Sequence, residues 1–544
     1  MNSNSYYLKA NVVIEPLIDG WYAWSHLISP ATFAMNIVGR HLKIMTSYIQ
    51  APQLHAQAVK SPKLLGGPFM DYAFDRRDEV QGLMKETLAK RARNIELAKA
   101  IKELDQMLLS EGKGFSLNPL YKKVPKILQG YVELIYDLHG NPSFRFFESL
   151  LYKSDFYDSD PQSIVLWLTN NDNRPFSLST PKLNDDEAFR LDIPFRSELI
   201  DSLSKLKREP RPMDEIKKLF DMNHIDFPSK FQDSFFTIKA PASYEKYVGE
   251  KIRMRYFGHA CILLETATFS ILVDPLISYY GYQSEIARYS DEDLPDVIDY
   301  VLITHNHQDH ILFETLLPLR HKIKNLVIPR TNSGKIQDPN LALMFNAIGF
   351  KNVVEIDELE AIEFHDLSIT GIPFIGEHCD LDIRAKICHH VRIENFSLLF
   401  LADSCNIEPE LYRHVQKEIG DVDVVFLGME CDGAPLSWLY GPLLSQNLSH
   451  DKDNSRRLSG SNYVQGRTLV EIFKPKELYV YAMGQEPWTK FISTKDYKDD
   501  SLPIVESNKI IEECRSKGIT AERLYGEKEL FYDKALKLTG PLFR

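Results

Sequence analysis

Hydrophobic residues follow two different spacings along the chain. Between about residues 80 and 225 they recur at three- and four-residue intervals, which predicts helices. The run VQGLMKETLAKRARNIELAKAIKELDQMLL (80–109) is the clearest case, because it is also rich in strong helix formers. A β-like run, SIVLWLT (163–169), interrupts this half, and the charged, proline-bearing KREPRPMDE (207–215) is typical of a surface connection. We therefore predict a mostly helical α+β N-terminal domain over residues 1–246.

The second half has short β-rich runs instead, with helical stretches between several of them. Strands that alternate with helices predict layered sheets covered by helices, here over residues 247–544. The fold class is therefore α/β. The clearest predicted strands are KIRMRYF, CILLET, SILVDP, YVLIT, NLVIP, SLLFLA, DVVFL and LYVYAM.

An aromatic-rich segment lies near the N-terminus. WYAWSHLISPATFAMNIVGRHLKIMTSYIQAPQLH (21–55) combines aromatic residues with Pro30, Pro52 and three histidines, His26, His41 and His55. One interpretation is a core or interface segment. The other is a lining for the active site of its own or a neighbouring subunit.

Bulk properties narrow the function classes. The 544 residues carry a formal net charge of −12, which is a poor electrostatic match for nucleic acid. The N-terminal sequence has no signal-peptide pattern and no run of about 18 apolar residues occurs, so we expect a cytoplasmic protein without a membrane span. The six cysteines form no CxxC pair, which argues against a disulfide framework or a cysteine zinc site. Cys379, Cys405 and Cys431 are interpreted as small buried residues.

The strongest chemical signal is DYVLITHNHQDH (299–310), in which ligand-type residues follow a hydrophobic strand. Alternate residues of an extended chain point the same way, so His305 and His307 can converge on one metal. Asp309 and His310 follow after a turn and can serve a second metal, typically about 3.5–4 Å from the first. The sequence therefore predicts a binuclear metal site.

The H-x-H-x-D-H pattern resembles the signature of the metallo-β-lactamase superfamily. YFGHACILLET (256–266) with ILVDP (271–275) resembles the first hairpin of that fold. GEHCDLD (376–382) lies where the superfamily places its next ligand, and FLADS (400–404) resembles the strand whose aspartate bridges the metals, which points to Asp403. The resemblance implies an αββα sandwich with the metals at one edge.

The chain departs from the superfamily at the last histidine ligand. The corresponding late strand, ELYVYAM (477–483), is followed by GQEPW (484–488), which has no histidine. His414, in a helical stretch, and His450, in a polar loop, are not convincing replacements.

A second departure is Glu377, immediately before His378, since either residue can complete the first metal's ligands. His378 would give three nitrogens, as in zinc hydrolases. Glu377 would give two histidines and one carboxylate, the set associated with non-haem iron and dioxygen. With Asp309, His310 and Asp403 on the second metal, the site then becomes rich in oxygen ligands.

That combination resembles the non-haem diiron β-hydroxylases of nonribosomal peptide and antibiotic biosynthesis, which carry a long N-terminal domain before a metallo-β-lactamase fold. GMECDGAPLSWLYGPLL (428–444) adds to the resemblance. It implies a monooxygenase with two iron ions that uses O2 and an external electron donor. It also implies an aminoacyl thioester on a carrier domain as substrate, Glu377 as an iron ligand and a homodimer. The alternative is a zinc-dependent hydrolase of a lactone, thioester or phosphodiester.

Several other residues have more than one interpretation. His378 and His389 are each a ligand or a supporting hydrogen-bond partner. His259 is expected to be a structural residue or a supporting hydrogen-bond partner of the ligands, and Asp274 is expected to be structural. Since carrier domains are often acidic, KRAR (90–93) and KLKR (205–208) are candidate basic docking areas or simply solvated helix faces. Plausible pocket residues at the ends of late strands are Glu430, Gln485, Glu486 and Trp488.

Overall fold

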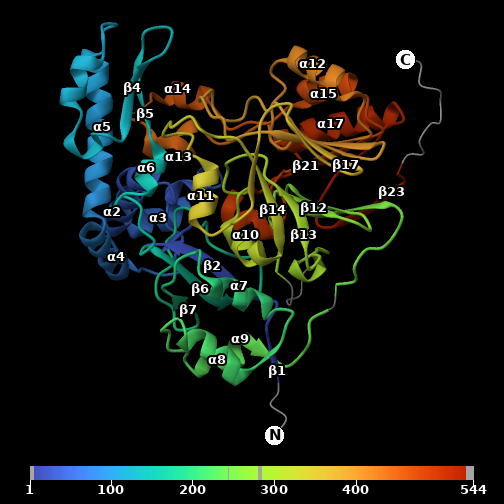
Figure 1. The fold of residues 1–544 in the computed structure, drawn as a ribbon, viewed down its shortest axis with the longest axis horizontal. Coiled ribbons are helices and arrows are strands. Elements are labelled where there is room, and N and C mark those ends of the chain that lie inside the picture. Colours follow the sequence, from blue (N-terminus) through green and yellow to red (C-terminus); the bar gives the residue numbers. More distant parts are fainter. Residues whose placement is uncertain (1–4, 243, 280–284, 447, 535–544) are drawn as a thin grey trace.

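Two seven-stranded β-sheets packed face to face form the C-terminal half of the protein (Figure 1). The computed structural model describes residues 5–242, 244–279, 285–446 and 448–534. The strand order of the first sheet is β15-β14-β13-β12-β11-β10-β23, and that of the second is β16-β17-β18-β19-β20-β21-β22. The predicted layered arrangement is therefore confirmed.

The first sheet begins as antiparallel hairpins and continues as parallel strands. β10, β11 and β12 are antiparallel, whereas β12, β13, β14 and β15 run parallel. The parallel order brings the carboxyl ends of β12 and β13 to the same edge, where the ligand motif begins. The strands are β10 (Ile252–Gly258), β11 (Cys261–Glu265), β12 (Ser270–Val273), β13 (Ile298–Leu302), β14 (Ile323–Pro329), β15 (Val353–Ile356) and β23 (Lys528–Tyr532).

The second sheet repeats this plan. β16 to β19 are antiparallel, and β19 to β22 are parallel. The strands are β16 (Ala361–Phe364), β17 (Leu367–Ile372), β18 (Cys388–Ile393), β19 (Phe396–Phe400), β20 (Val424–Gly428), β21 (Glu477–Tyr481) and β22 (Thr520–Arg523).

Apolar side chains from both sheets fill the space between them. Ile262, Val391 and Phe426 are fully buried members of this cluster. The other face of the second sheet is covered by three helices that lie together in Figure 1. They are α12 (Pro409–Ile419), α15 (Tyr463–Phe473) and α17 (Leu502–Ser516). The arrangement is the expected αββα sandwich.

The N-terminal half is an α+β assembly built on a four-stranded sheet of order β3-β2-β6-β7. The predicted strand at 163–169 is β6, which pairs along its length with β2. The strands of this half are β1 (Ser5–Leu8), β2 (Val12–Ile18), β3 (Trp21–Tyr22), β4 (Val132–Tyr136), β5 (Pro142–Phe146), β6 (Gln162–Leu168), β7 (Phe189–Leu191), β8 (Arg211–Pro212) and β9 (Phe236–Thr237). The helices are α1 (Pro30–Asn36), α2 (Leu42–Gln50), α3 (Pro52–Ala58), α4 (Arg77–Lys90), α5 (Ala92–Glu111), α6 (Glu148–Tyr152), α7 (Glu198–Lys205), α8 (Met213–Asp221) and α9 (Lys230–Phe235).

The helical run 80–109 is broken into two helices at Arg91. This residue leaves helical geometry (φ −108°, ψ 21°) and is buried, with its guanidinium 2.7 Å from Asp19 and 3.5 Å from Asp158. Periodicity did not predict the break, because a tertiary ion pair holds the residue at the junction.

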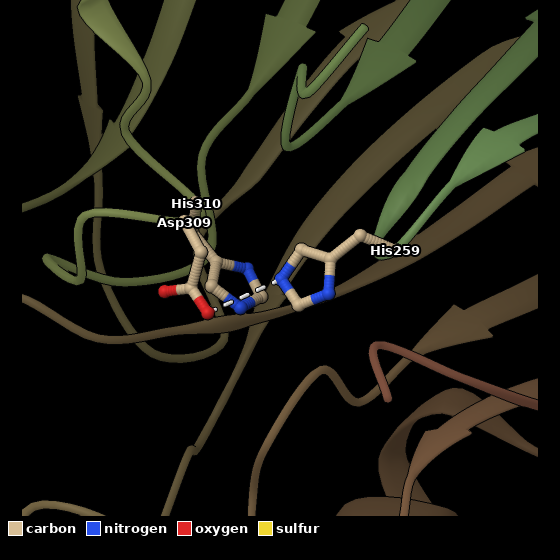
Figure 2. Close-up of side chains that lie close together, drawn as sticks. All are labelled: His259, Asp309 and His310. Atoms are coloured by element: carbon tan, nitrogen blue, oxygen red, sulfur yellow. Dashed lines mark ion pairs between the residues drawn. The ribbon is translucent and has the colours of Figure 1, made fainter. Parts of the chain in front are cut away.

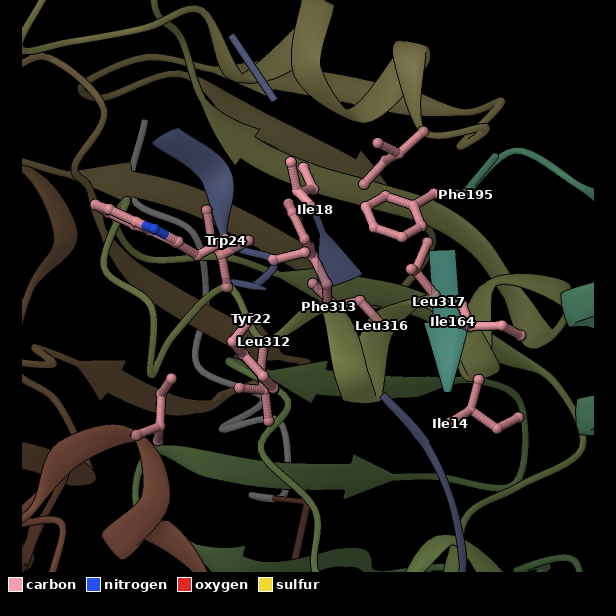
Figure 3. Close-up of a cluster of buried hydrophobic side chains, with 14 of the residues drawn as sticks. Ile14, Ile18, Tyr22, Trp24, Ile164, Phe195, Leu312, Phe313, Leu316 and Leu317 are labelled. Carbon is pink, nitrogen blue, oxygen red and sulfur yellow. The ribbon is translucent and has the colours of Figure 1, made fainter. Parts of the chain in front are cut away.

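The two halves share a hydrophobic core. Helix α10 (Phe313–Leu319) starts three residues after His310 and buries its apolar face against β2 and β6 of the N-terminal half. Figure 3 shows Leu312, Phe313 and Leu316 among N-terminal side chains such as Tyr22 and Ile164. At its polar side, Arg174 binds Glu314 through two hydrogen bonds of 2.8 and 2.9 Å. The N-terminal half thereby braces the segment that follows the ligand motif.

The remaining helices of the C-terminal half are short. They are α11 (Leu341–Ala347), α13 (Leu436–Tyr440), α14 (His450–Ser455) and α16 (Lys490–Ser493). Within the residues described above, no helix is long and apolar enough to cross a membrane.

Candidate metal centre

The histidines of the predicted motif lie directly beyond the end of β13. The backbone from Thr304 to Asn306 stays extended, because it pairs with residues 385–387 at the edge of the second sheet. This places His305 and His307 on one side, and Nε2 of His305 lies 3.2 Å from Nδ1 of His307. The two rings converge as the sequence predicted.

Two carboxylates complete this cluster. Oε1 of Glu377 lies 2.7 Å from Nδ1 of His307, and its Oε2 lies 3.7 Å from Nε2 of His305. Oδ2 of Asp403 lies 3.0 Å from Nε2 of His310 and 3.7 Å from Nε2 of His305. His305 therefore belongs to two potential ligand groups, one with His307 and Glu377 and one with His310 and Asp403.

A third potential ligand group joins Asp309 and His310 to His259 (Figure 2). Nε2 of His259 lies 3.5 Å from Oδ2 of Asp309, and neither ring nitrogen of His259 has a hydrogen-bond partner among the residues that the structure describes. The sequence predicts a structural or supporting role for His259, whereas the structure places it among potential ligands. Its position at the turn between β10 and β11, which lies at the ligand edge of the sheet, is the signal that could have identified it.

Unusual backbone geometry holds the two carboxylates in place. Glu377 has a left-handed backbone (φ 61°), and so does Ala402 (φ 44°), the residue before Asp403. Such conformations cost of order 1 kcal/mol or more, and they persist only where the surroundings enforce them. At Gly428 a Cβ would lie 2.8 Å from Oδ1 of Asp403 and 2.3 Å from the Ala402 carbonyl oxygen, so only glycine fits beside this turn.

Buried residues outside the ligand groups support the histidines. Asp274 accepts hydrogen bonds from the Thr304 amide (2.8 Å) and hydroxyl (2.6 Å), and its Oδ2 lies 2.8 Å from Nδ1 of His310. His389 donates from Nε2 to the Ile303 carbonyl at 2.9 Å, two residues before the motif. His389 thus supports the strand end and lies outside the three potential ligand groups.

His378 also lies outside those three groups, although it is fully enclosed. Its ring centroid is 4.6 Å from that of His307, and its Nδ1 is 3.1 Å from Oε2 of Glu377. The geometry therefore favours Glu377 over His378 as the donor that faces His305 and His307.

Burial and neighbouring charges oppose each other in the pocket. Burial raises the pKa of Glu377 above its usual value, although His307 beside it acts in the other direction. Burial would lower the pKa of His310, but the carboxylates of Asp274 and Asp403 raise it well above the usual value. Burial would raise the pKa of Asp309, yet His259 and His310 hold it below its usual value. Each charge is thus compensated only by its neighbours.

The donor set fits metal ions that prefer nitrogen and oxygen ligands. Among the described residues, Oε2 of Glu377 and Oδ1 of Asp403 are buried without a hydrogen bond, an arrangement that is unfavourable unless a cation satisfies them. The cysteines lie outside the three potential ligand groups of the described residues, and burial raises the pKa of Cys379 to about 12 and that of Cys405 to about 11. Cys379 and Cys405 are buried, as the sequence predicts, whereas Cys431 is only partly buried.

The late strand β21 provides no histidine. Glu486, which follows it, is buried and accepts a hydrogen bond of 2.5 Å from the Tyr256 hydroxyl. Trp488 is also buried and packs against Gly258, so both residues support the first hairpin. His414 and His450 are exposed on α12 and α14. The position of the usual last ligand is therefore occupied by structural residues, and the buried side-chain oxygen of Gln485 has no hydrogen-bond partner in the described part of the chain.

A cavity of about 730 Å³ opens beside the ligand groups. His307, Asp309, Glu377 and Asp403 line its inner end. Its walls include residues that sequence reasoning did not single out, namely Arg40 and Leu178 of the N-terminal half and Trp438, Lys495 and Tyr497 of the C-terminal half.

The aromatic N-terminal segment fits both of its interpretations. Trp21 and Trp24 are buried in the core, whereas Arg40 faces the cavity and donates to the Trp438 carbonyl at 2.5 Å. The Tyr440 hydroxyl, which lies beside this segment, is 3.3 Å from Nε2 of His307. The N-terminal half thus contributes to the wall of the site.

The two basic runs are largely used within the chain. Arg91 binds Asp19, and Arg93 lies 3.0 Å from Asp155. Arg208 binds Asp296 and three backbone carbonyls of residues 291–294. These contacts give both runs a structural role at the junctions of the fold.

Comparisons with known proteins agree with the architecture. Residues 7–239 match a family described as the N-terminal domain of diiron non-haem β-hydroxylases, and residues 270–434 match the β-lactamase superfamily domain. The chain is 38% identical over 96% of its length to the 4-amino-L-phenylalanyl-[CmlP-peptidyl-carrier-protein] 3-hydroxylase of Streptomyces venezuelae, of which 99% is covered.

Solved structures give the same result. The crystal structure of CmlA, a diiron β-hydroxylase from Streptomyces venezuelae, is similar with a TM-score of 0.91 and 37% identity, covering 97% of this chain and all of that one. A mutant of the CmlA β-hydroxylase gives a TM-score of 0.89 at the same identity and coverage.

Proposed function

This chain belongs to the family of non-haem diiron β-hydroxylases, and on that premise we propose that it hydroxylates the β-carbon of an aminoacyl group held as a thioester on a carrier domain. The observation that carries the proposal is the position of Glu377, which brings a carboxylate between His305 and His307. A similar protein of nearly equal length is named for this reaction on a peptidyl carrier protein.

We assign six residues to the iron ions. His305, His307 and Glu377 would hold one, and Asp309, His310 and Asp403 the other. His310 supports the second set, because it lies in one potential ligand group with Asp403 and in another with Asp309 and His259. The bound irons supply the redox chemistry that O2 activation requires, which a zinc site lacks. One oxygen atom enters the C–H bond and the other leaves as water, so each turnover takes two electrons and two protons from an external donor.

The chain's own residues fix the geometry of this centre. Asp274 holds the His310 ring from its far nitrogen, and His389 fixes the strand end before His305. Arg40 lines the cavity from the N-terminal half, and the Tyr440 hydroxyl lies 3.3 Å from Nε2 of His307. The aminoacyl group would enter this cavity with its β-carbon toward Glu377 and Asp403.

A zinc-dependent hydrolase is less well supported. Hydrolases of this fold usually take a last histidine after the late strand, where this chain has Gln485 and Glu486. The oxygen-rich donor set also favours iron over zinc.

The partners follow from the same proposal. We infer a carrier domain, an external electron donor and a homodimer, with the N-terminal domain, ending near residue 246, serving association and carrier recognition. The assigned ligands all follow residue 250, so this domain would act on delivery of the substrate and not as a source of ligands.

The test uses the full chain loaded with iron and a carrier domain bearing the 4-amino-L-phenylalanyl group. We expect about two irons per chain by elemental analysis, and a product heavier by one oxygen atom after reduction and exposure to O2. Stoichiometric zinc that supports turnover, with release of the acyl group and no gain of oxygen, would establish the hydrolase instead.

A further inference from the structure

Four carboxylates line the active-site cavity outside the proposed iron ligands, within the part of the chain that the structure describes. They are Glu430, Asp432, Asp453 and Asp496. An aminoacyl thioester carries an α-ammonium group, and a cation entering a partly buried cavity needs a carboxylate partner there. The hydrogen bonds and the exposure of the four side chains show which of them is suited to bind such a cation.

Three of the four carboxylates are committed elsewhere. Asp453 accepts hydrogen bonds from the amide and the hydroxyl of Ser437, at 2.8 and 2.6 Å. The side chain of Asp432 is 58% exposed at the cavity's outer part beside Arg457, and that of Asp496 is 62% exposed beside Lys490. Carboxylates so exposed give only weak ionic contacts.

Glu430 has a different environment. It lies two residues beyond the end of β20, the parallel neighbour of β19, which leads into Asp403. Its side chain is only 19% exposed, and its partner is the ammonium of Lys495. The backbones of Asp403 and Glu430 both approach Gly460. A Cβ at Gly460 would lie 3.4 Å from the Asp403 carbonyl oxygen and 3.5 Å from the Glu430 amide nitrogen.

Lys495 connects this pair to the metal end of the cavity. Burial lowers the pKa of Lys495 to about 8, although the charges of Asp309, Asp403 and Glu377 act to raise it. The Lys495 ammonium directly contacts Glu430. A cation at this position is also attracted electrostatically by the carboxylates of Asp309, Asp403 and Glu377.

We propose that Glu430 binds the α-ammonium group of the aminoacyl substrate, in the place that the Lys495 ammonium occupies in this structure. This subsite rests on the proposed function. The amine nitrogen and the β-carbon are two bonds apart, so an anchor one strand away from Asp403 fixes the β-carbon close to the reacting end of the cavity. Correct placement of this kind is a large part of catalysis.

The exchange keeps charge balanced, since one ammonium replaces another on Glu430. Without Lys495 the carboxylate would be desolvated and unpaired before substrate binds, which is unfavourable. An acyl group that lacks the amine cannot displace Lys495, and it meets an occupied subsite. The pair therefore selects for acyl groups with a free α-amine.

The test compares two substrates on the same carrier domain: the aminoacyl thioester, and the analogue with hydrogen in place of the amine. The full-length iron-loaded wild type should prefer the aminoacyl group by about tenfold or more in kcat/KM, as expected for loss of a partly buried charge pair. Glu430→Gln should lose about tenfold or more on the aminoacyl group, mainly through KM, and should bring the ratio of the two substrates near one. A Glu430→Gln variant that discriminates as wild type does would overturn the assignment.

Two further variants serve as controls. Asp432→Asn alters a carboxylate of the same cavity and should keep the wild-type ratio of kcat/KM for the two substrates. Glu430→Gln and Asp432→Asn should each bind as much iron as wild type. Lys495→Gln frees Glu430 and should keep the preference for the amine, so its loss in that variant would also refute the proposal. If the wild type hydroxylates both substrates equally, only the anchor is wrong. If it hydroxylates neither, the proposed function is wrong and the anchor falls with it.

Discussion

The imidazole of His310 lies between two carboxylates, with Nδ1 2.8 Å from Asp274 and Nε2 3.0 Å from Asp403. Asp274 is completely buried and its other contacts go to Thr304, so it is held rigidly. An anion behind a histidine fixes the ring's orientation and strengthens it as a ligand. The residue that the sequence analysis expected to be structural therefore governs the geometry of a proposed ligand.

Asp274→Asn should weaken metal binding without changing any proposed ligand. The amide keeps the shape but loses the negative charge behind His310, so we expect iron affinity to fall by about 10- to 100-fold. Competition with a chelator would measure the change. Asp299→Asn is a suitable control, because Asp299 caps the start of β12 through Ser270. Equal affinity in the two variants would show that Asp274 serves folding alone.

Glu377→Gln should reduce O2-dependent hydroxylation by about 100-fold or more while retaining part of the iron, since it removes the anionic donor between His305 and His307. His378→Gln should be milder, because His378 lies outside the ligand groups. Single-turnover assays with product detected by mass would compare them. If Glu377→Gln reacts at the wild-type rate while His378→Gln loses its metal, the histidine-ligated arrangement is correct.

Leu316→Ala should destabilise the whole chain. Leu316 is completely buried where α10 meets the N-terminal half, and such truncations cost about 2–5 kcal/mol. Chemical denaturation would report the loss, with the 51% exposed Leu359→Ala expected to stay within about 0.5 kcal/mol of wild type. A small effect at Leu316 would mean that the two halves fold independently. By the same reasoning, a chain beginning near Tyr247 should be unstable.

Glu148→Gln should stabilise the protein above neutral pH. Burial raises the pKa of Glu148 from 4.5 to about 7, and its Oε2 accepts a hydrogen bond from the Asn340 amide at 3.0 Å. Between these pH values the folded protein keeps a proton that the unfolded chain has released, so stability falls as the pH rises. Glutamine keeps an oxygen that accepts the Asn340 hydrogen bond, and it carries no ionisable proton. It therefore removes the free-energy cost of ionising a buried Glu148, which is about 2–4 kcal/mol at pH 8.

Urea titrations between pH 4.5 and 8 would test this change. The variant should show a flatter dependence on pH than the wild type, whereas Glu187→Gln at an exposed carboxylate should leave the slope unchanged. A parallel pH dependence for wild type and Glu148→Gln would contradict the prediction.

Sequence patterns predicted the central strands of the sandwich well, because strands such as β11, β19 and β20 are buried on both faces and carry an apolar run. The edge strand β16 is largely exposed and gave no such pattern. The eight predicted strands of the C-terminal half are all present, and His305, His307 and His310 meet as their spacing indicated. Local information was sufficient for these features, since the residues are neighbours in the chain.

Features that depend on distant contacts could not be predicted in this way. The helix break at Arg91 needs Asp19, and the strands of the β4–β5 hairpin are only half-buried and lack the continuous apolar run that marks the buried strands. His259 meets Asp309 from fifty positions away, through the alignment of two strand ends. Lys495 faces the cavity only because the chain returns to it after β21.

The attachment of α10 to the N-terminal half has a consequence for recombination between related enzymes. A crossover near residue 246, where the hydrophobic pattern changes from helical spacing to short β-rich runs, would pack β2 from one parent against α10 from the other. Their interlocking side chains would then be mismatched directly behind the motif that ends at His310. Hybrids intended to change carrier or substrate should therefore inherit residues 311–322 from the parent that donates the N-terminal half. The α10 side chains and the N-terminal side chains that pack against them then come from the same parent.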